Sequence, residues 1–156
     1  MCTSVATTLL AVALIVGMAC CKDPDRGPPP NAFAVAATAA KVVPPASDTM
    51  PRAMAYVNSS LAYNYSVEVA PAGTIDSIAL YEGDAGVALP PSAIAILCAG
   101  AAACAATSGT ATVVAPATVA SIRTSMGRNR TQLVFFTTTA QKAAGGAMRG
   151  TVYPYQ

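Results

Sequence analysis

The sequence predicts an all-β domain, an antiparallel Greek-key-like β-sandwich of about seven or eight short strands. Residues 61–69 (LAYNYSVEV) show the clearest strand pattern, because apolar and polar side chains alternate along them. Residues 132–138 (QLVFFTT) are rich in aromatic and β-branched side chains, which favour strands. Gly and Pro recur between such segments, as turns in an all-β fold require.

The same turn signals divide the rest of the folded part. We expect a strand starting at Phe33 and further strands at 50–57, 74–81, 93–97, 108–114 and 147–153. A short helix fits residues 116–126, with Pro116 near its start and Gly127 after its end. The Ala-rich stretches leave a helix-rich fold as an alternative, although Pro, Thr, Val and Gly interrupt them.

The N-terminal segment has the pattern of an export signal. Residues 8–19 (TLLAVALIVGMA) form an apolar run too short to span a bilayer, and Cys20 and Cys21 follow it. Small residues before Cys20 resemble a bacterial lipobox, in which the cysteine becomes the lipidated mature N-terminus. Gly17 stands where Leu is usual, and the opening residues MCTS lack Lys and Arg. We therefore expect a lipoprotein signal at 1–19 and lipidation of Cys20, with Cys21 as the fallback.

This interpretation divides the chain into three parts. Residues 20–31 hold the lipidated cysteine and a tether, whose three consecutive prolines favour an extended chain. Residues 32–156 form the folded domain. Secretion without lipid and an uncleaved anchor helix are the alternatives. We expect an exported protein, anchored by lipid to a membrane of the bacterial envelope, which is the outer membrane in a Gram-negative cell.

The remaining cysteines form a natural pair. If Cys2 leaves with the signal and Cys20 or Cys21 carries lipid, then Cys98 and Cys104 remain, separated by AGAAA. In an oxidising compartment such a pair predicts a disulfide that closes a short loop. A redox-active pair is the alternative, although it normally has the tighter CxxC spacing.

Composition excludes several classes of protein. The chain of 156 residues has a net charge of +2, only 10% charged residues, and no His. Without His there is no Ser-His-Asp triad, no His general base and no His metal ligand. The only loose basic cluster, Arg123, Arg128 and Arg130, lacks the interleaved aromatic residues of a nucleic-acid site. We expect no nucleic-acid partner, no cofactor and no metal.

The order of the segments resembles the CHRD domain, first named in chordin and widespread in bacterial secreted proteins. The resemblance covers residues 33–152 and rests on four pieces: 41–45 (KVVPP), 53–69, 75–86 (IDSIALYEGDAG) and 133–150. Within the last piece, residues 146–150 (GAMRG) are the most specific match. The resemblance implies structural roles for Pro44, Pro45, Gly146, Arg149 and Gly150.

The chain departs from the CHRD pattern at the family's characteristic histidines. These positions hold Ala79, Tyr81 and Phe136, none of which can supply an imidazole ligand. A metal-linked role suspected for relatives is therefore not carried over, and the resemblance implies a retained scaffold.

Few residues suggest chemistry. Glu82 and Asp84 flank Gly83, which fits either a carboxylate pair or, as we expect, a solvated turn. Arg149 could recognise an anion, but we expect a structural ion pair or a clamp on backbone carbonyls. Ser125 has no base in its sequence neighbourhood.

Three acidic residues are the candidate partners of Arg149: Glu68, Asp76 and Glu82. Four tyrosines could line one sheet face, either as a stripe that binds sugars or peptides or, as we expect, as core residues with their hydroxyls at the rim. They are Tyr56, Tyr63, Tyr65 and Tyr81.

These observations favour a non-enzymatic envelope lipoprotein, whose domain binds an unknown protein or glycan or has a structural role. A secreted adhesin or matrix component without lipid is one alternative. A metal enzyme with a superoxide-dismutase-like sandwich is another, against which the absence of His argues.

Overall fold

The computed structural model describes residues 32–42, 51–141 and 145–155, and every structural statement below refers to these residues. Antiparallel strands dominate the domain. The strands are β1 (Ala32–Thr38), β2 (Arg52–Asn58), β3 (Ala62–Val69), β4 (Ile75–Glu82), β5 (Ala95–Ala99), β6 (Ser108–Thr110), β7 (Thr112–Val113), β8 (Thr131–Thr137), β9 (Met148–Thr151) and β10 (Tyr153–Pro154). The helices are η1 (Ala39–Lys41), α2 (Ala101–Cys104) and α3 (Val119–Gly127).

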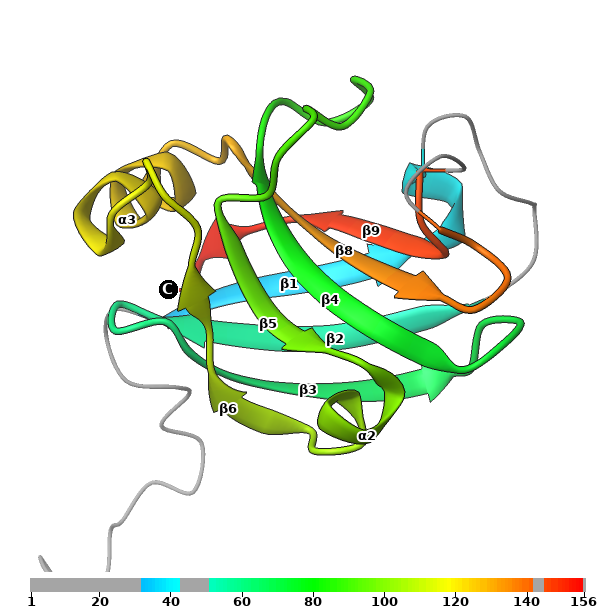
Figure 1. Cartoon of the computed structure of the whole chain (residues 1–156). Coiled ribbons are helices and arrows are strands. Elements are labelled where there is room, and N and C mark those ends of the chain that lie inside the picture. Colours follow the sequence, from blue (N-terminus) through cyan, green and yellow to red (C-terminus); the bar gives the residue numbers. More distant parts are fainter. Residues whose placement is uncertain (1–31, 43–50, 142–144, 156) are drawn as a thin grey trace, which may run out of the picture.

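All ten strands belong to one sheet that nearly closes on itself (Figure 1). The order is β6-β3-β2-β1-β9-β8-β4-β5-β7, and β10 pairs with β1 outside this path. The two end strands, β6 and β7, are separated in sequence only by Ala111, whose N–H donates to the carbonyl of Leu61 at 2.9 Å. Residues 108–113 therefore pair first with β3 and then with β5, and they link the two edges of the sheet.

The all-β prediction is confirmed, and the predicted strands lie close to the observed ones. The predicted helix also forms, at 119–127, where Thr118 and Ser121 make a reciprocal capping box at its N-terminus. The short helices η1 and α2 were not expected from the sequence. None of the helices in the described ranges is long and apolar enough to cross a membrane.

The main core fills the inside of the curved sheet. In β2 every second side chain is buried, and in β3 Tyr63 and Tyr65 are buried as the alternation predicted; these side chains meet Ile78, Leu133 and Phe135 from the opposite strands. Val67, which the alternation placed on the same face, is 36% exposed. Strand β8 differs, because all seven of its residues are buried. Its inward side chains join the main core, whereas Val134 and Phe136 face outward into a second apolar cluster. Burial on both faces explains why residues 132–138 show no alternation.

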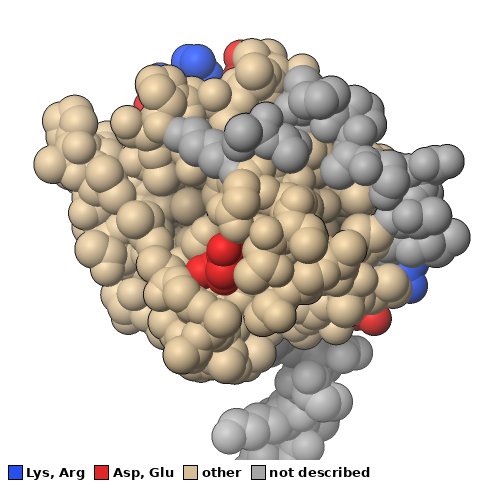
Figure 2. All heavy atoms as spheres, turned by 45° about the vertical axis from the view of Figure 1, so that its right-hand side comes forward, with Lys and Arg blue, Asp and Glu red and all other residues tan. Residues whose placement is uncertain are grey.

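The outer surface carries few charges. Charged side chains are scattered over the face in Figure 2, most of which consists of uncharged residues. One exposed ion pair joins Arg52 and Glu68 at 2.7 Å. Such a pair contributes little stability, because water screens it.

Two glycines let the strand pair β8–β9 fit against its neighbours. A Cβ on Gly150 would lie 2.5 Å from the carbonyl oxygen of Ala36 and 2.6 Å from Val35 Cγ1, so β1 and β9 could not stay in contact. Gly146 has a φ of +90°, and a Cβ there would lie 2.6 Å from Val134 Cγ1. Both positions therefore require glycine for steric reasons.

We predict that Gly150→Ala will destabilise the domain by about 3 kcal/mol or more, because backbone must move to admit the methyl group. Gly127→Ala is the matched control, since Gly127 ends α3 and a Cβ added there would have nothing within 4 Å. The control should be neutral or stabilising by about 0.5 kcal/mol. Urea unfolding of both variants measures the difference, and equal midpoints would show that β1 and β9 do not need this close approach.

Candidate functional site

The most unusual polar group of the domain is Arg149 on β9, which is 1% exposed. Its guanidinium donates to three oxygens: from Nη1 to the carbonyl of Val87 (2.6 Å), from Nη2 to the carbonyl of Asp84 (3.2 Å) and from Nε to Gln132 Oε1 (3.4 Å). Two of these acceptors belong to the β4–β5 connection, so Arg149 fixes that loop against β8 and β9. Burial lowers the pKa of Arg149, because desolvation penalises its charged form.

The acceptors differ from the acidic partners that we predicted. Glu68 pairs with Arg52, and the carboxylate of Asp76 accepts from Gln141 Nε2 at 2.7 Å. The described residues form two ion pairs, neither of which includes Arg149 or Glu82. The clamp on backbone carbonyls is therefore the arrangement found. Carbonyl dipoles can hold a guanidinium without a carboxylate when several of its N–H groups are bound.

Beside Arg149 the outward side of β4 and β8 carries the second apolar cluster. It contains Ala79, Tyr81, Val134 and Phe136, with Leu89 and Ala93 of the β4–β5 connection packed against it. The rings of Tyr81 and Phe136 are 6.1 Å apart in an edge-on arrangement. Burial raises the pKa of Tyr81 through desolvation.

This cluster unites the three positions at which the CHRD resemblance places histidines: Ala79, Tyr81 and Phe136. Here they make an apolar contact. Within the described residues no group of three His, Cys, Asp or Glu side chains could hold a metal ion.

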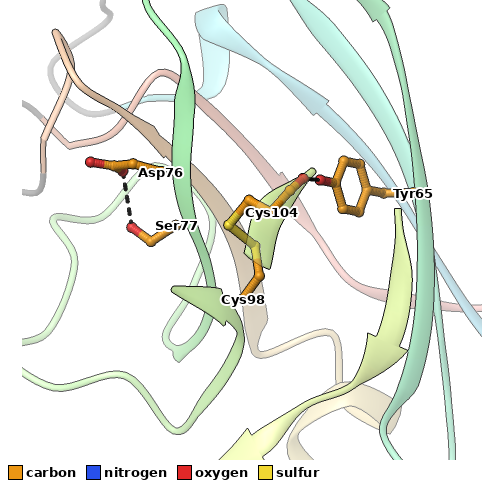
Figure 3. Close-up of a disulfide and its surroundings, with 5 residues drawn as sticks. All are labelled: Tyr65, Asp76, Ser77, Cys98 and Cys104. Atoms are coloured by element: carbon orange, nitrogen blue, oxygen red, sulfur yellow. Dashed lines mark hydrogen bonds between the residues drawn. A yellow bond between two sulfur atoms is a disulfide. The ribbon is translucent and has the colours of Figure 1, made fainter. Parts of the chain in front are cut away.

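The disulfide joins β5 to α2. Cys98 and Cys104 are joined with their Cα atoms 5.2 Å apart, and the residues between them include most of α2 (Figure 3). The hydroxyl of Tyr65 on β3 donates to the carbonyl of Cys104. Burial is the main cause that raises the pKa of Tyr65, and the nearby Tyr63 raises it further. Both cysteines are buried, so the bridge ties α2 to the core.

The predicted tyrosine stripe is divided between the two sides of the sheet. Tyr63 and Tyr65 face the main core, and Tyr81 faces the second cluster. Tyr56 instead lies on the outward side of β2 and contacts Tyr155, with ring centroids 5.9 Å apart. The sequence pattern did not indicate Tyr153 and Tyr155, which follow β9 and remain 48% and 39% exposed.

The other candidate polar residues have structural contacts. Asp84 is exposed and forms an ion pair with Arg130 at 3.4 Å. Ser125 Oγ donates to the carbonyl of Arg130 and accepts from Thr131 Oγ1, both at 3.0 Å. Glu82 is the exposed last residue of β4.

Sequence reasoning missed a pocket of about 510 Å³ beside the Arg149 clamp. Its lining includes Lys41 of η1, Gly86 of the β4–β5 connection, and Gln132, Thr151 and Tyr153. Gln132 and Thr151 are 2% and 5% exposed, so buried polar groups form part of its wall. These residues are far apart in sequence and share no motif, so only the fold brings them together.

Comparison with family models, with curated proteins and with solved structures found no match in any of the three. Several predicted residues lie outside the described ranges, namely the signal at 1–19, Cys20, Cys21, the tether, Pro44 and Pro45.

We predict that Arg149→Ala will lower the free energy of unfolding by about 3 kcal/mol, because it leaves two loop carbonyls and the Gln132 amide without their donor. Arg149→Lys should lose less, since one ammonium keeps the charge but cannot reach all three acceptors. Arg128→Ala is the control at an exposed guanidinium and should change stability by less than about 0.5 kcal/mol. Thermal unfolding of the three variants measures their relative stability. If Arg149→Ala is as stable as Arg128→Ala, Arg149 is not a structural clamp.

The disulfide should contribute to the stability of the domain. Replacing Cys98 and Cys104 together by Ala should cost about 2 kcal/mol, as chain entropy requires for a loop closed over a sequence separation of 6. Dithiothreitol should lower the melting temperature of the wild-type chain and leave that of the double variant unchanged. If the reductant destabilises both equally, its effect does not come from this bridge.

Proposed function

We propose that the chain is an exported lipoprotein of the bacterial envelope, in which residues 32–156 make up a non-catalytic binding or structural domain. The observation that carries the proposal is the apolar run of residues 8–19 ending in Ala19-Cys20, followed by a Pro-rich segment. Acylation of Cys20 would hold the domain at a membrane surface, and residues 22–30 would separate the two.

The disulfide supports export. Buried structural disulfides persist in the periplasm and outside the cell, whereas cytosolic thiols are kept reduced. Cys98 and Cys104 have the separation and burial of such a structural pair.

The contacts of the polar residues support a non-catalytic role. Arg149 holds the β4–β5 connection, Ser125 joins α3 to the start of β8, and Asp84 is paired with Arg130. Each of these groups has a structural task that explains its position. The meeting of positions 79, 81 and 136 in one cluster also supports a CHRD-like scaffold whose histidine positions have become apolar.

We predict that the full chain, expressed in a bacterium fed an alkynyl palmitate, will be labelled, because the thiol of the lipobox cysteine receives the lipid. Cys20→Ala should abolish the label, whereas the matched variants Cys2→Ala and Cys21→Ala should keep it. Mass spectrometry should then show a mature N-terminus that begins at Cys20.

Two results would change this assignment. A label lost only in Cys21→Ala moves the anchor to Cys21. An unlabelled chain released into the medium contradicts the anchor and favours the secreted adhesin or matrix protein.

A further inference from the structure

The pocket beside the Arg149 clamp has polar walls that hydrogen bonds hold in a fixed orientation. Gln132 Oε1 accepts from Arg149 Nε and from Thr151 Oγ1 (3.2 Å). The amide oxygen is therefore turned to the guanidinium, and Nε2 donates to Thr151 Oγ1 (3.0 Å) and to the carbonyl of Gly83 (3.3 Å). Both N–H groups of this amide and the hydroxyl hydrogen of Thr151 are used in these bonds, so Gln132 and Thr151 form a fixed polar wall rather than donors to a ligand.

The one charged side chain in the described lining of the pocket is positive. Lys41 belongs to its wall and donates from Nζ to the carbonyl of Ala36 at 3.1 Å, and the guanidinium of Arg149 lies behind Gln132. The described lining includes no Asp or Glu. The nearest acidic residue in sequence, Asp84, directs its carboxylate to Arg130. A ligand carrying a carboxylate would complement this field.

An aromatic strip continues from the pocket across the outward side of the sheet. Tyr153 belongs to the pocket wall and lies opposite Ala34 of β1, which on its other side lies opposite Tyr56 of β2. Tyr155 then contacts Tyr56 through its ring.

The strip ends at a second hollow of about 210 Å³. Its lining includes Tyr56, Asn58 and Asn64, and Asn64 lies opposite Tyr56 across the β2–β3 pair. Amide groups and tyrosine hydroxyls can exchange hydrogen bonds with a ligand rich in hydroxyl groups. The two hollows with tyrosines between them fit an elongated ligand rather than a single small molecule.

We propose that this outward face binds an acidic oligosaccharide, with a sugar carboxylate at the ammonium of Lys41, which has N–H groups beyond the one bound to Ala36, and sugar rings along Tyr153, Tyr56 and Tyr155. Tyrosine faces suit the C–H faces of sugars, because they offer rigid apolar area beside a hydroxyl. This inference deepens the proposed binding role of the domain and names the class of its ligand.

Isothermal titration calorimetry on the full chain, purified from expressing cells in detergent, tests the proposal. The acidic probes are tetragalacturonate and tetramannuronate, and maltotetraose is the neutral probe of equal length. We expect at least one acidic probe to bind about tenfold more tightly than maltotetraose, and to bind more weakly as NaCl rises from about 0.05 to about 0.5 M. Because labelling by palmitate is scored separately on the same preparation, failure of the anchor and failure of binding are distinguishable.

Two pocket variants localise the binding. Lys41→Met should weaken it about fivefold and Tyr153→Ala about tenfold, with unchanged melting temperatures, because both side chains are exposed. Arg128→Met removes an exposed cation outside the described pocket lining. The affinity of this variant for the acidic probe should stay within about twofold of wild type. The proposal is overturned if neither acidic probe binds, or if both pocket variants bind as the wild type does. Equal binding of a tetraglutamate peptide would also overturn it, because the site would then recognise carboxylates without recognising sugar.

Discussion

The buried guanidinium of Arg149 imposes the constraint on which the outward side of this domain depends. A charge placed at this depth needs an acceptor for each of its nitrogens, and the ion pairs of the described residues leave it no carboxylate. The carbonyls of Asp84 and Val87 meet that need only if the β4–β5 connection folds back over β8 and β9. The same loop then covers Tyr81 and Phe136 and completes the pocket wall at Gly86. Arg149 thus holds the β4–β5 connection in place, and that connection covers the second apolar cluster and forms part of the pocket wall.

The sequence predicts the fold where local patterns decide it. Residues 61–69 alternate because one face of β3 meets the core, and Pro116 and Gly127 bracket a helix that Thr118 caps. The closing of the sheet by residues 108–113 is different. It depends on pairing with β3 and β5, two strands that are not neighbours in sequence.

The candidate site was harder to predict for a related reason. Acidic residues were expected to neutralise Arg149, because charge is visible in a sequence and the direction of a backbone carbonyl is not. Tyr56 of β2 faces outward, whereas Tyr63 and Tyr65 of β3 face the core. The alternation along one strand does not continue through the β2–β3 turn, so it could not predict whether tyrosines of both strands lie on the same side of the sheet. Tyr153 and Tyr155 follow β9 without a sequence pattern that would have indicated an exposed aromatic surface.

The outward face of the sheet has a covered part and an open part, and this difference indicates where a partner can make contact. The inward side chains fill the core, so recognition must use the outer side of the sheet or its loops. Over β4 and β8 the β4–β5 connection already covers that side, whereas over β1 and β2 Ala34, Met54 and Tyr56 remain partly open to solvent. The pocket of Lys41 and Thr151 lies where the covered region meets the open one. A ligand that enters there gains a rigid polar wall from the clamp and aromatic surface from the open strands, and neither region alone offers both.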